Sequence, residues 1–233
     1  MAIFLVAHGA WSGGWIWKKM RPLMAARGHQ LYAPTMTGLG DRSHLAHRGI
    51  DLEAHIADVL AVLEYENLHD VILVGHSYGG MVATGVADRA RERFKHLVYL
   101  DAFVPDAGKS ANDYISPVRA DVMRRTAIEG WKVASIPIPS DTSPEDTVWL
   151  MARRMPQPLA CLEQKFEFKN GPLTLPRTYI YAQRYLPGDP FRQFLERARK
   201  EGWPVHEMEA SHSPHVTAPE ALMEILQGIA ASG

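Results

Sequence analysis

The stretch Val71–Gly80 decides the fold and reads Val-Ile-Leu-Val-Gly-His-Ser-Tyr-Gly-Gly. Four aliphatic residues, typical of a strand buried on both faces of a sheet, lead directly into the pattern Gly-x-Ser-x-Gly. The residues from Met81 onward fit a helix, so the serine is expected at a sharp turn between strand and helix. Gly75 and Gly79 have no Cβ, which lets the neighbouring backbones approach closely. The stretch therefore predicts a nucleophile elbow, with the Ser77 hydroxyl projecting above the sheet.

A nucleotide-binding turn is the alternative interpretation of this glycine-rich stretch. Such a turn is followed by a Lys-Ser or Lys-Thr phosphate signature, and the sequence after Gly80 has none. The sequence context therefore favours the nucleophile elbow.

Apolar runs and amphipathic segments alternate on both sides of the elbow. The apolar runs predict further strands over residues 3–7, 30–34, 96–103, 178–182 and 205–208. Spacings of three and four between apolar residues predict helices between the strands, and the last helix begins near Pro219. Repeated β-α-β units of this kind predict a doubly wound, mostly parallel sheet of the α/β class.

The alternation is interrupted over residues 105–175. Prolines recur there at positions 117, 137, 139, 144, 156, 158 and 172, between helical fragments that carry tryptophan and methionine. The segment is too apolar for a disordered linker and too broken for a βαβ unit. We expect a mainly helical cap, inserted into a core that residues 1–104 and 176–233 form.

The composition argues against several classes of function. The chain has 233 residues, of which 46% are hydrophobic, and a net charge of −1 without a basic run. This charge argues against a nucleic acid or an anionic membrane surface as a partner. No apolar stretch is long enough to span a bilayer, and the apolar run of residues 2–7 is too short for a signal peptide. The single Cys161 fits a reducing compartment, so we expect a cytoplasmic protein.

A serine hydroxyl needs a base, which in an elbow fold follows the final strand. The segment Glu209–His215 occupies that place and holds two candidates. We expect His212 to be the base, because it follows the strand closely and lies among small residues. His215, nearer the last helix, is expected to line the pocket or the surface. A His-x-x-His metal site is the alternative, but no carboxylate or cysteine clusters with the pair, so we expect no bound metal.

An acid must orient this histidine, and two aspartates compete for the role. Asp189 follows the strand expected over residues 178–182, but it also fits the N-cap of the next helix. Asp101 lies in the otherwise apolar run 97–103, where a carboxylate is costly without a partner. A turn cap before Pro105 is the plainer interpretation of Asp101. We expect Asp101 to be the acid and keep Asp189 as the alternative.

Negative charge develops on the substrate oxygen during attack and requires preorganised N–H donors. The N–H of Tyr78, directly after the serine, is one donor, and we expect the second to be Ala10 in the loop His8–Gly14. A plain βα turn is the alternative interpretation of this loop. The candidates for lining the substrate pocket are Trp11, His76, Trp131 and His215.

Together these residues resemble the α/β-hydrolase superfamily, and more narrowly its branch of plant methyl esterases, hydroxynitrile lyases and bacterial carboxylesterases such as pyrethroid hydrolases. The motifs that carry the resemblance are His-Gly-Ala-Trp-x-x-Gly-Trp-x-Trp at 8–17, Ala-Pro-x-x-Thr-Gly-x-Gly at 33–40, Gly-His-Ser-Tyr-Gly-Gly at 75–80, Phe-Val-Pro-Asp at 103–106, and His212 with Ala-Pro-Glu at 218–220. The resemblance implies that Ser77 is the nucleophile and His212 the base, with Ala10 and Tyr78 forming the oxyanion hole. It also implies a homodimer.

Two departures from that branch matter. Its plant members have an aspartate after the strand that residues 178–182 match, whereas Tyr185 stands at that position here. The acid therefore cannot be carried over to that loop, which favours Asp101. The cyanogenic lyases have a lysine beside the histidine and a threonine in the first loop. Ser213 and Ala10 occupy these places, which argues against cyanohydrin cleavage.

We therefore expect a cofactor-free serine carboxylesterase that hydrolyses a small apolar ester, aryl or alkyl, through an acyl-enzyme. Thioester, lactone, amide or C–C bond chemistry on the same scaffold is the first alternative. A ligand receptor that has kept the fold without the turnover is the second.

Overall fold

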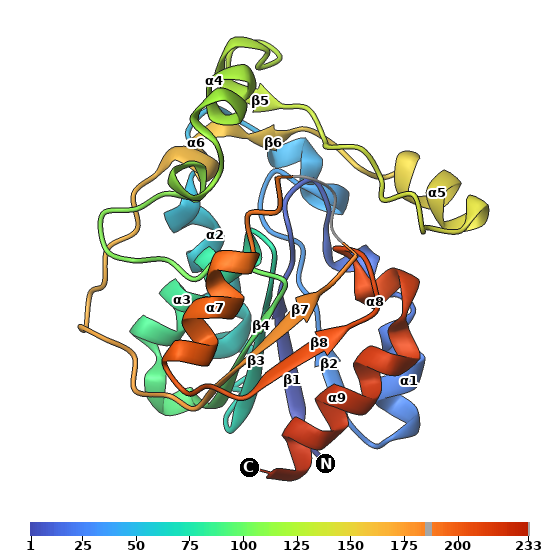
Figure 1. Cartoon of the computed structure of the whole chain (residues 1–233). Helices are drawn as coiled ribbons and strands as arrows, with labels where there is room; N and C mark the ends of the chain where they lie inside the picture. Colours follow the sequence, from blue (N-terminus) through green and yellow to red (C-terminus); the bar gives the residue numbers. More distant parts are fainter. Residues whose placement is uncertain (185–187, 233) are drawn as a thin grey trace.

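A computed structural model of the chain describes residues 1–184 and 188–232. Its centre is a six-stranded sheet of order β2-β1-β3-β4-β7-β8, in which neighbouring strands run parallel (Figure 1). The strands are β1 (Ile3–Ala7), β2 (Gln30–Tyr32), β3 (Val71–His76), β4 (Phe94–Leu100), β7 (Arg177–Ala182) and β8 (Val205–Met208). The doubly wound parallel sheet predicted from the sequence is confirmed. Strand β4 ends before residue 103 because the chain turns at Asp101, whose φ is 43°.

Helices cover both faces of this sheet (Figure 1). One face carries α1 (Met20–Ala26) and α9 (Pro219–Ser232), and the opposite face carries α2 (Leu52–Tyr65), α3 (Gly79–Arg89) and α7 (Arg192–Lys200). The short helix α8 (Pro214–Thr217) leads into α9, and 3-10 turns η1 (Gly14–Trp17), η2 (Gly40–Leu45) and η3 (Arg91–Arg93) lie in connections. The Asp51 side chain caps α2 by accepting a hydrogen bond from the Ala54 N–H at 3.0 Å.

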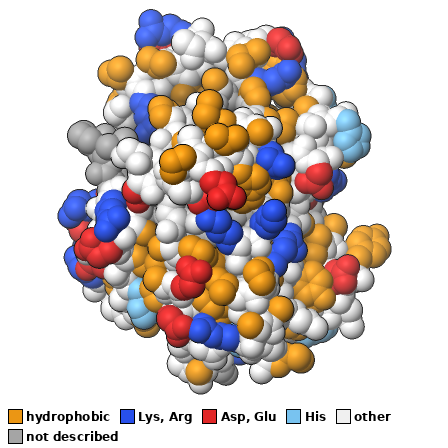
Figure 2. Space-filling view, turned by 90° about the vertical axis from the view of Figure 1, so that its right-hand side faces the viewer, with side chains coloured by type: hydrophobic (Ala, Val, Ile, Leu, Met, Phe, Trp, Pro, Cys, Tyr) orange, Lys and Arg blue, Asp and Glu red, His pale blue; other side chains and the backbone are white. Residues whose placement is uncertain are grey.

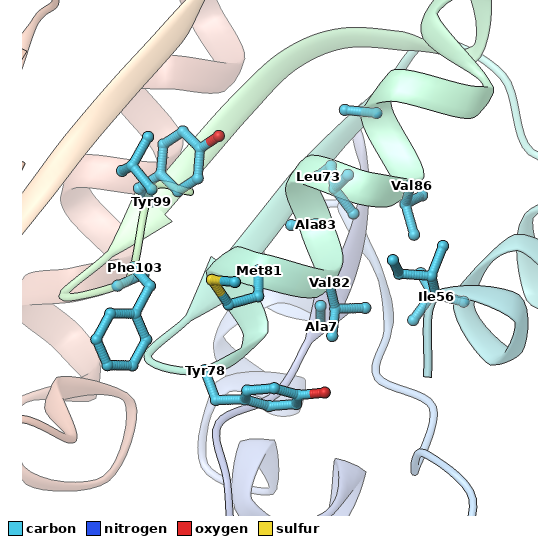
Figure 3. Close-up of a cluster of buried hydrophobic side chains, with 14 of the residues drawn as sticks. Ala7, Ile56, Leu73, Tyr78, Met81, Val82, Ala83, Val86, Tyr99 and Phe103 are labelled. Atoms are coloured by element: carbon cyan, nitrogen blue, oxygen red, sulfur yellow. The ribbon is translucent and has the colours of Figure 1, made fainter. Parts of the chain in front are cut away.

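Strand side chains point alternately into two hydrophobic clusters, as the pleat of a strand requires. On β1, Leu5 belongs to the cluster beneath α2, α3 and α7, whereas Phe4 belongs to the cluster beneath α1 and α9. Figure 3 shows part of the first cluster, where Ile56 of α2 lies beside Val82 and Val86 of α3. Burial on both faces explains why these strands are continuous apolar runs.

Most of the chain between β4 and β7 lies over the carboxyl ends of the strands, and its last part, after α6, returns along the side of the molecule past α3 to the start of β7 (Figure 1). It contains η4 (Ala111–Tyr114), α4 (Pro117–Arg125), β5 (Lys132–Val133), α5 (Pro144–Met151), β6 (Gln157–Pro158) and α6 (Leu159–Glu163). Strands β5 and β6 form an antiparallel pair that the sequence analysis did not predict. Two residues are too few to produce a readable alternation, and this pairing joins positions far apart in the chain. We call residues 105–175 the insertion.

Two surface properties bear on the function classes considered above. The face displayed in Figure 2 carries acidic and basic side chains interspersed with hydrophobic ones. No helix among residues 1–184 and 188–232 has the length and apolar character needed to cross a bilayer.

Candidate active site

The turn between β3 and α3 holds Ser77 in a strained conformation. Its φ is 56°, in the left-handed region that a residue other than glycine occupies at a cost of about 1–2 kcal/mol. A Cβ added at Gly79 would lie 2.0 Å from the carbonyl oxygen of Ala7. One added at Gly75 would lie 2.8 Å from the Cβ of Ala83. Strand and helix can approach this closely only because both positions are glycine, as the sequence predicts.

The loop after β8 brings His212 to this serine. The Ser77 hydroxyl lies 2.9 Å from Nε2 of His212 and can donate its proton there. On the other side of the ring, the Nδ1–H donates to Oδ2 of Asp101 at 2.7 Å. The ring of Phe191 stacks on the imidazole with 4.9 Å between centroids and 9° between planes. These contacts hold the imidazole in one orientation and one tautomer.

The position of Asp101 is set by β4, which it follows, and by the neighbouring strand β7. The residue follows β4, is fully buried, and donates its backbone N–H to the carbonyl oxygen of Ile180 at 2.7 Å. Its Oδ1 accepts a hydrogen bond from the Ala182 N–H at 3.2 Å. Both carboxylate oxygens therefore have donors, so the carboxylate that the sequence analysis singled out as costly is satisfied.

The alternative acid, Asp189, has other partners. Its carboxylate accepts hydrogen bonds from the Tyr181 hydroxyl and the Phe191 N–H. Because α7 begins at Arg192 with Phe191 as its N-cap, Asp189 closes a turn before the helix and does not form the expected N-cap. Tyr185, which stands where the plant enzymes have their aspartate, lies outside the described residues.

Burial sets the protonation of this hydrogen-bonded chain. Desolvation is the largest influence on His212 and lowers its pKa below the usual value, and the nearby positive charge of Arg154 lowers it further. Desolvation also raises the pKa of Asp101, while the Ala182 N–H opposes that shift. A neutral imidazole at neutral pH is the form that can accept the serine proton.

Two backbone amides beside the serine are available to a ligand. Ala10 and Tyr78 line one cavity together with Ser77, and neither N–H donates a hydrogen bond to another described residue. The N–H of Trp11, in contrast, donates to Oε1 of Gln157 at 3.2 Å. The Trp11 indole also donates to a carbonyl of β5 at 3.0 Å, so β5 and β6 hold the Ala10 loop in place. Two free amides beside one hydroxyl can donate hydrogen bonds to a negatively charged oxygen bound in the cavity.

Two buried histidines support these amides. His8 donates from Nδ1 to the carbonyl oxygen of Gly9 at 2.8 Å, and its Nε2 accepts from the Met36 N–H at 3.1 Å. His55 uses Nδ1 to accept the Tyr78 hydroxyl at 3.1 Å. Desolvation lowers the pKa of both histidines to about 4, so both are neutral at neutral pH. Their hydrogen bonds hold the Gly9 backbone and the Tyr78 side chain in place.

Two further histidines lie behind the candidate base. His76 donates from Nε2 to the carbonyl oxygen of His212 at 2.7 Å. His215 is fully buried, stacked on Trp17 at 4.7 Å between centroids and in edge contact with His76 at 4.5 Å. The expectation that His215 reaches the pocket or the surface is therefore wrong, because the turn of α8 directs its ring into the packed layer behind the loop.

The cavity above Ser77 lies between the sheet and the insertion and has an empty volume of about 440 Å³, which includes its open mouth. Apolar side chains form most of its wall: Trp11, Phe103, Ile115, Met123, Ile136, Leu162 and Phe191. Of the four expected pocket residues, Trp11 alone is in the wall. Trp131 instead contacts Glu129 and the ammonium group of Lys132 at the surface of the insertion.

The comparison with known families decides the classification. The model of the Alpha/beta hydrolase family matches residues 3–225. The chain belongs to this family. A carbendazim hydrolyzing esterase of Nocardioides sp. (strain SG-4G) is 38% identical to this hydrolase over 98% of the chain and 100% of the relative. Methylesterase 2 of Arabidopsis thaliana is 31% identical over 55% of the chain and 48% of the relative.

Solved structures agree with the fold of this hydrolase. An extracellular alpha/beta-hydrolase from a Paenibacillus species superposes with a TM-score of 0.86 and 21% identity, covering 98% of both chains. The methylesterase MES16 from Arabidopsis superposes with a TM-score of 0.81 and 23% identity over the whole of both chains. At these identities the superpositions support the fold, and the fold predicted by resemblance is confirmed.

Sequence reasoning missed several residues that surround the serine of this hydrolase. Gln157 holds the Ala10 loop, His55 holds Tyr78, and Phe191 stacks on His212. All three act across more than 20 positions of sequence, and no local motif marks them. The one available signal is Gln157, which lies between two prolines in an otherwise apolar run and therefore requires a hydrogen-bond partner if it is buried.

Proposed function

We propose that this hydrolase is a serine carboxylesterase with Ser77 as nucleophile, His212 as general base and Asp101 as the acid. The observation that carries the proposal is the continuous hydrogen-bonded chain from the Ser77 hydroxyl through both nitrogens of His212 to the buried carboxylate. The esterase relatives support ester hydrolysis as the reaction.

The proposed reaction has two halves. In the first, Nε2 of His212 takes the hydroxyl proton while Oγ of Ser77 attacks the ester carbonyl carbon. The amides of Ala10 and Tyr78 stabilise the oxyanion, and the alcohol leaves with the proton from His212. In the second, a water gives its proton to Nε2 and attacks the acyl carbon, which releases the acid and returns the proton to Ser77.

The wall of the cavity supports an apolar substrate. Its aromatic and aliphatic side chains come from both the sheet edge and the insertion, which would act as a cap over an aryl or alkyl ester. Substrate specificity is therefore proposed to reside largely in the insertion. A cytoplasmic location and a homodimeric state are further proposals, which rest on the sequence analysis.

The substitution Ser77→Ala tests the proposal. We expect kcat for p-nitrophenyl acetate to fall by at least about 10⁴-fold, because the nucleophile is lost. Circular dichroism and the unfolding midpoint should match those of the wild type. Ser232→Ala, at the exposed end of α9, is the matched control and should keep full activity. Turnover retained by Ser77→Ala would refute the mechanism. A wild type that binds esters without hydrolysing them would favour the receptor alternative.

A further inference from the structure

Two polar side chains in the cavity wall have no role in the reaction described above. Asn112 belongs to η4 and Arg119 to α4, and both line the cavity that holds Ser77 and His212. The rest of the wall contributed by the insertion is apolar. Polar groups in such a wall require a reason, because a polar group that loses water without gaining a partner costs free energy.

The side chain of Asn112 is desolvated and unpartnered. Its residue is 7% exposed, its Nδ2 is buried, and its amide makes no hydrogen bond with another described residue. A buried amide N–H that makes no hydrogen bond has lost its water without gaining a partner, which costs free energy. A ligand oxygen in the cavity would recover this loss by accepting from Nδ2.

Arg119 is a half-buried cation without a counter-ion in the described part of the chain. Neighbours on the same helix differ in this respect, because Arg124 pairs with Glu163 and Arg125 pairs with Asp121. None of the described residues that line the cavity is acidic. The charge of Arg119 is also felt at the reacting groups, since it lowers the pKa of His212. Arg119 therefore gives the described wall of the cavity a positive charge with which an anionic group of a substrate could pair.

We propose that Asn112 and Arg119 form a subsite for a carboxylate that the ester substrate carries away from its reacting carbonyl. This inference rests on the proposed esterase function and adds the substrate class: half-esters, in which one carboxyl of a dicarboxylic acid is esterified and the other is free. A guanidinium and an amide N–H together match the two oxygens of a carboxylate. Ile115 and Met123, which line the same cavity, would contact the carbon chain that links the two ends of the substrate.

A pair of chromogenic esters tests the subsite. Mono-p-nitrophenyl glutarate carries a free carboxylate, whereas p-nitrophenyl pentanoate has a methyl group at that end. The readout is the ratio of their kcat/KM values, anionic over neutral. We expect the wild type to favour the anionic ester and Arg119→Met to lower the ratio by at least about tenfold, because a charge-assisted hydrogen bond is lost. Arg119→Lys should restore part of it.

Arg125→Met is the matched control, since it removes the same charge from the exposed end of α4 outside the cavity wall. Arg125→Met should leave the ratio of the two kcat/KM values unchanged. If it lowered the ratio as much as Arg119→Met does, the effect would come from the net charge of the protein, and the proposal would be overturned. Asn112→Leu should lower the ratio as Arg119→Met does. The proposal would also be overturned if the wild-type ratio were close to 1 and Arg119→Met did not change it.

The neutral diester methyl p-nitrophenyl glutarate separates a carboxylate from a carbonyl acceptor. The proposal that the subsite binds a carboxylate would be overturned if the wild type hydrolysed the diester as fast as the half-ester and Asn112→Leu lost that activity. Failure of the underlying function gives a different result. In that case the wild type hydrolyses none of the three esters, whereas failure of the subsite leaves hydrolysis intact without anionic preference.

Discussion

Replacing Asp101 by asparagine removes one negative charge and keeps the shape of the buried side chain. In the proposed reaction His212 becomes a cation in the transition state, facing this carboxylate across a 2.7 Å hydrogen bond. Two unit charges about 4 Å apart attract by about 4 kcal/mol at an effective dielectric constant of about 20. Loss of this stabilisation corresponds to a fall in kcat of about 10³-fold. The asparagine N–H can also force the wrong tautomer on the imidazole, which acts in the same direction.

The assay is steady-state hydrolysis of p-nitrophenyl acetate, with Asp189→Asn as the matched control. Asp189 contacts Tyr181 and Phe191, so its substitution should change kcat by less than about fivefold. If kcat of Asp101→Asn fell by less than about tenfold, the assignment of Asp101 as the acid would be refuted. So would a larger loss in Asp189→Asn, which would move the role to the loop after β7.

Three further predictions concern stability and pH. Gly79→Ala should destabilise the fold by at least about 2 kcal/mol in urea unfolding, because its Cβ would meet a carbonyl oxygen at 2.0 Å. Gly228→Ala in α9, where a Cβ meets nothing within 4 Å, should stabilise by about 0.5–1 kcal/mol; equal effects at the two positions would contradict the packing argument. As the pH is lowered, kcat/KM should decline with a midpoint below pH 6.5, because burial lowers the pKa of His212. A midpoint well above pH 6.5 would contradict this. The free energy of unfolding should fall as the pH drops from 6.5 to 4, since the unfolded chain binds protons at His8 and His55 that the folded chain, with both pKa values lowered to about 4, does not. Each histidine contributes about 3 kcal/mol to this loss, and a stability independent of pH over the range would exclude it.

The fold and the centre of the site could be predicted from the sequence because their signals are local. A strand, two obligatory glycines and a helix define the turn at Ser77 within ten residues. The position of His212 follows from its place after the last strand. Asp101 could be singled out because burying a lone carboxylate in an apolar strand costs free energy unless it has a partner. The structure places its Oδ2 2.7 Å from Nδ1 of His212.

The surroundings of the site could not be predicted, because they depend on how the insertion packs on the sheet. The pairing of β5 with β6 brings Gln157 to the loop of Ala10, a contact across almost 150 positions. Trp131 was expected in the pocket from its residue type alone, and the geometry of the insertion turns it to the surface. Asn112 and Arg119 likewise carry no motif, and their position in the cavity wall depends on the docking of η4 and α4.

The acyl-enzyme is the intermediate on which the account depends, and mass spectrometry of a reaction quenched during steady-state turnover of p-nitrophenyl acetate detects it directly. We predict a mass increase of one acetyl group, located by peptide mapping on the segment that contains Ser77 and missing in Ser77→Ala. Hydrolysis without an adduct, or an adduct on another residue with Ser77→Ala still active, would contradict the account.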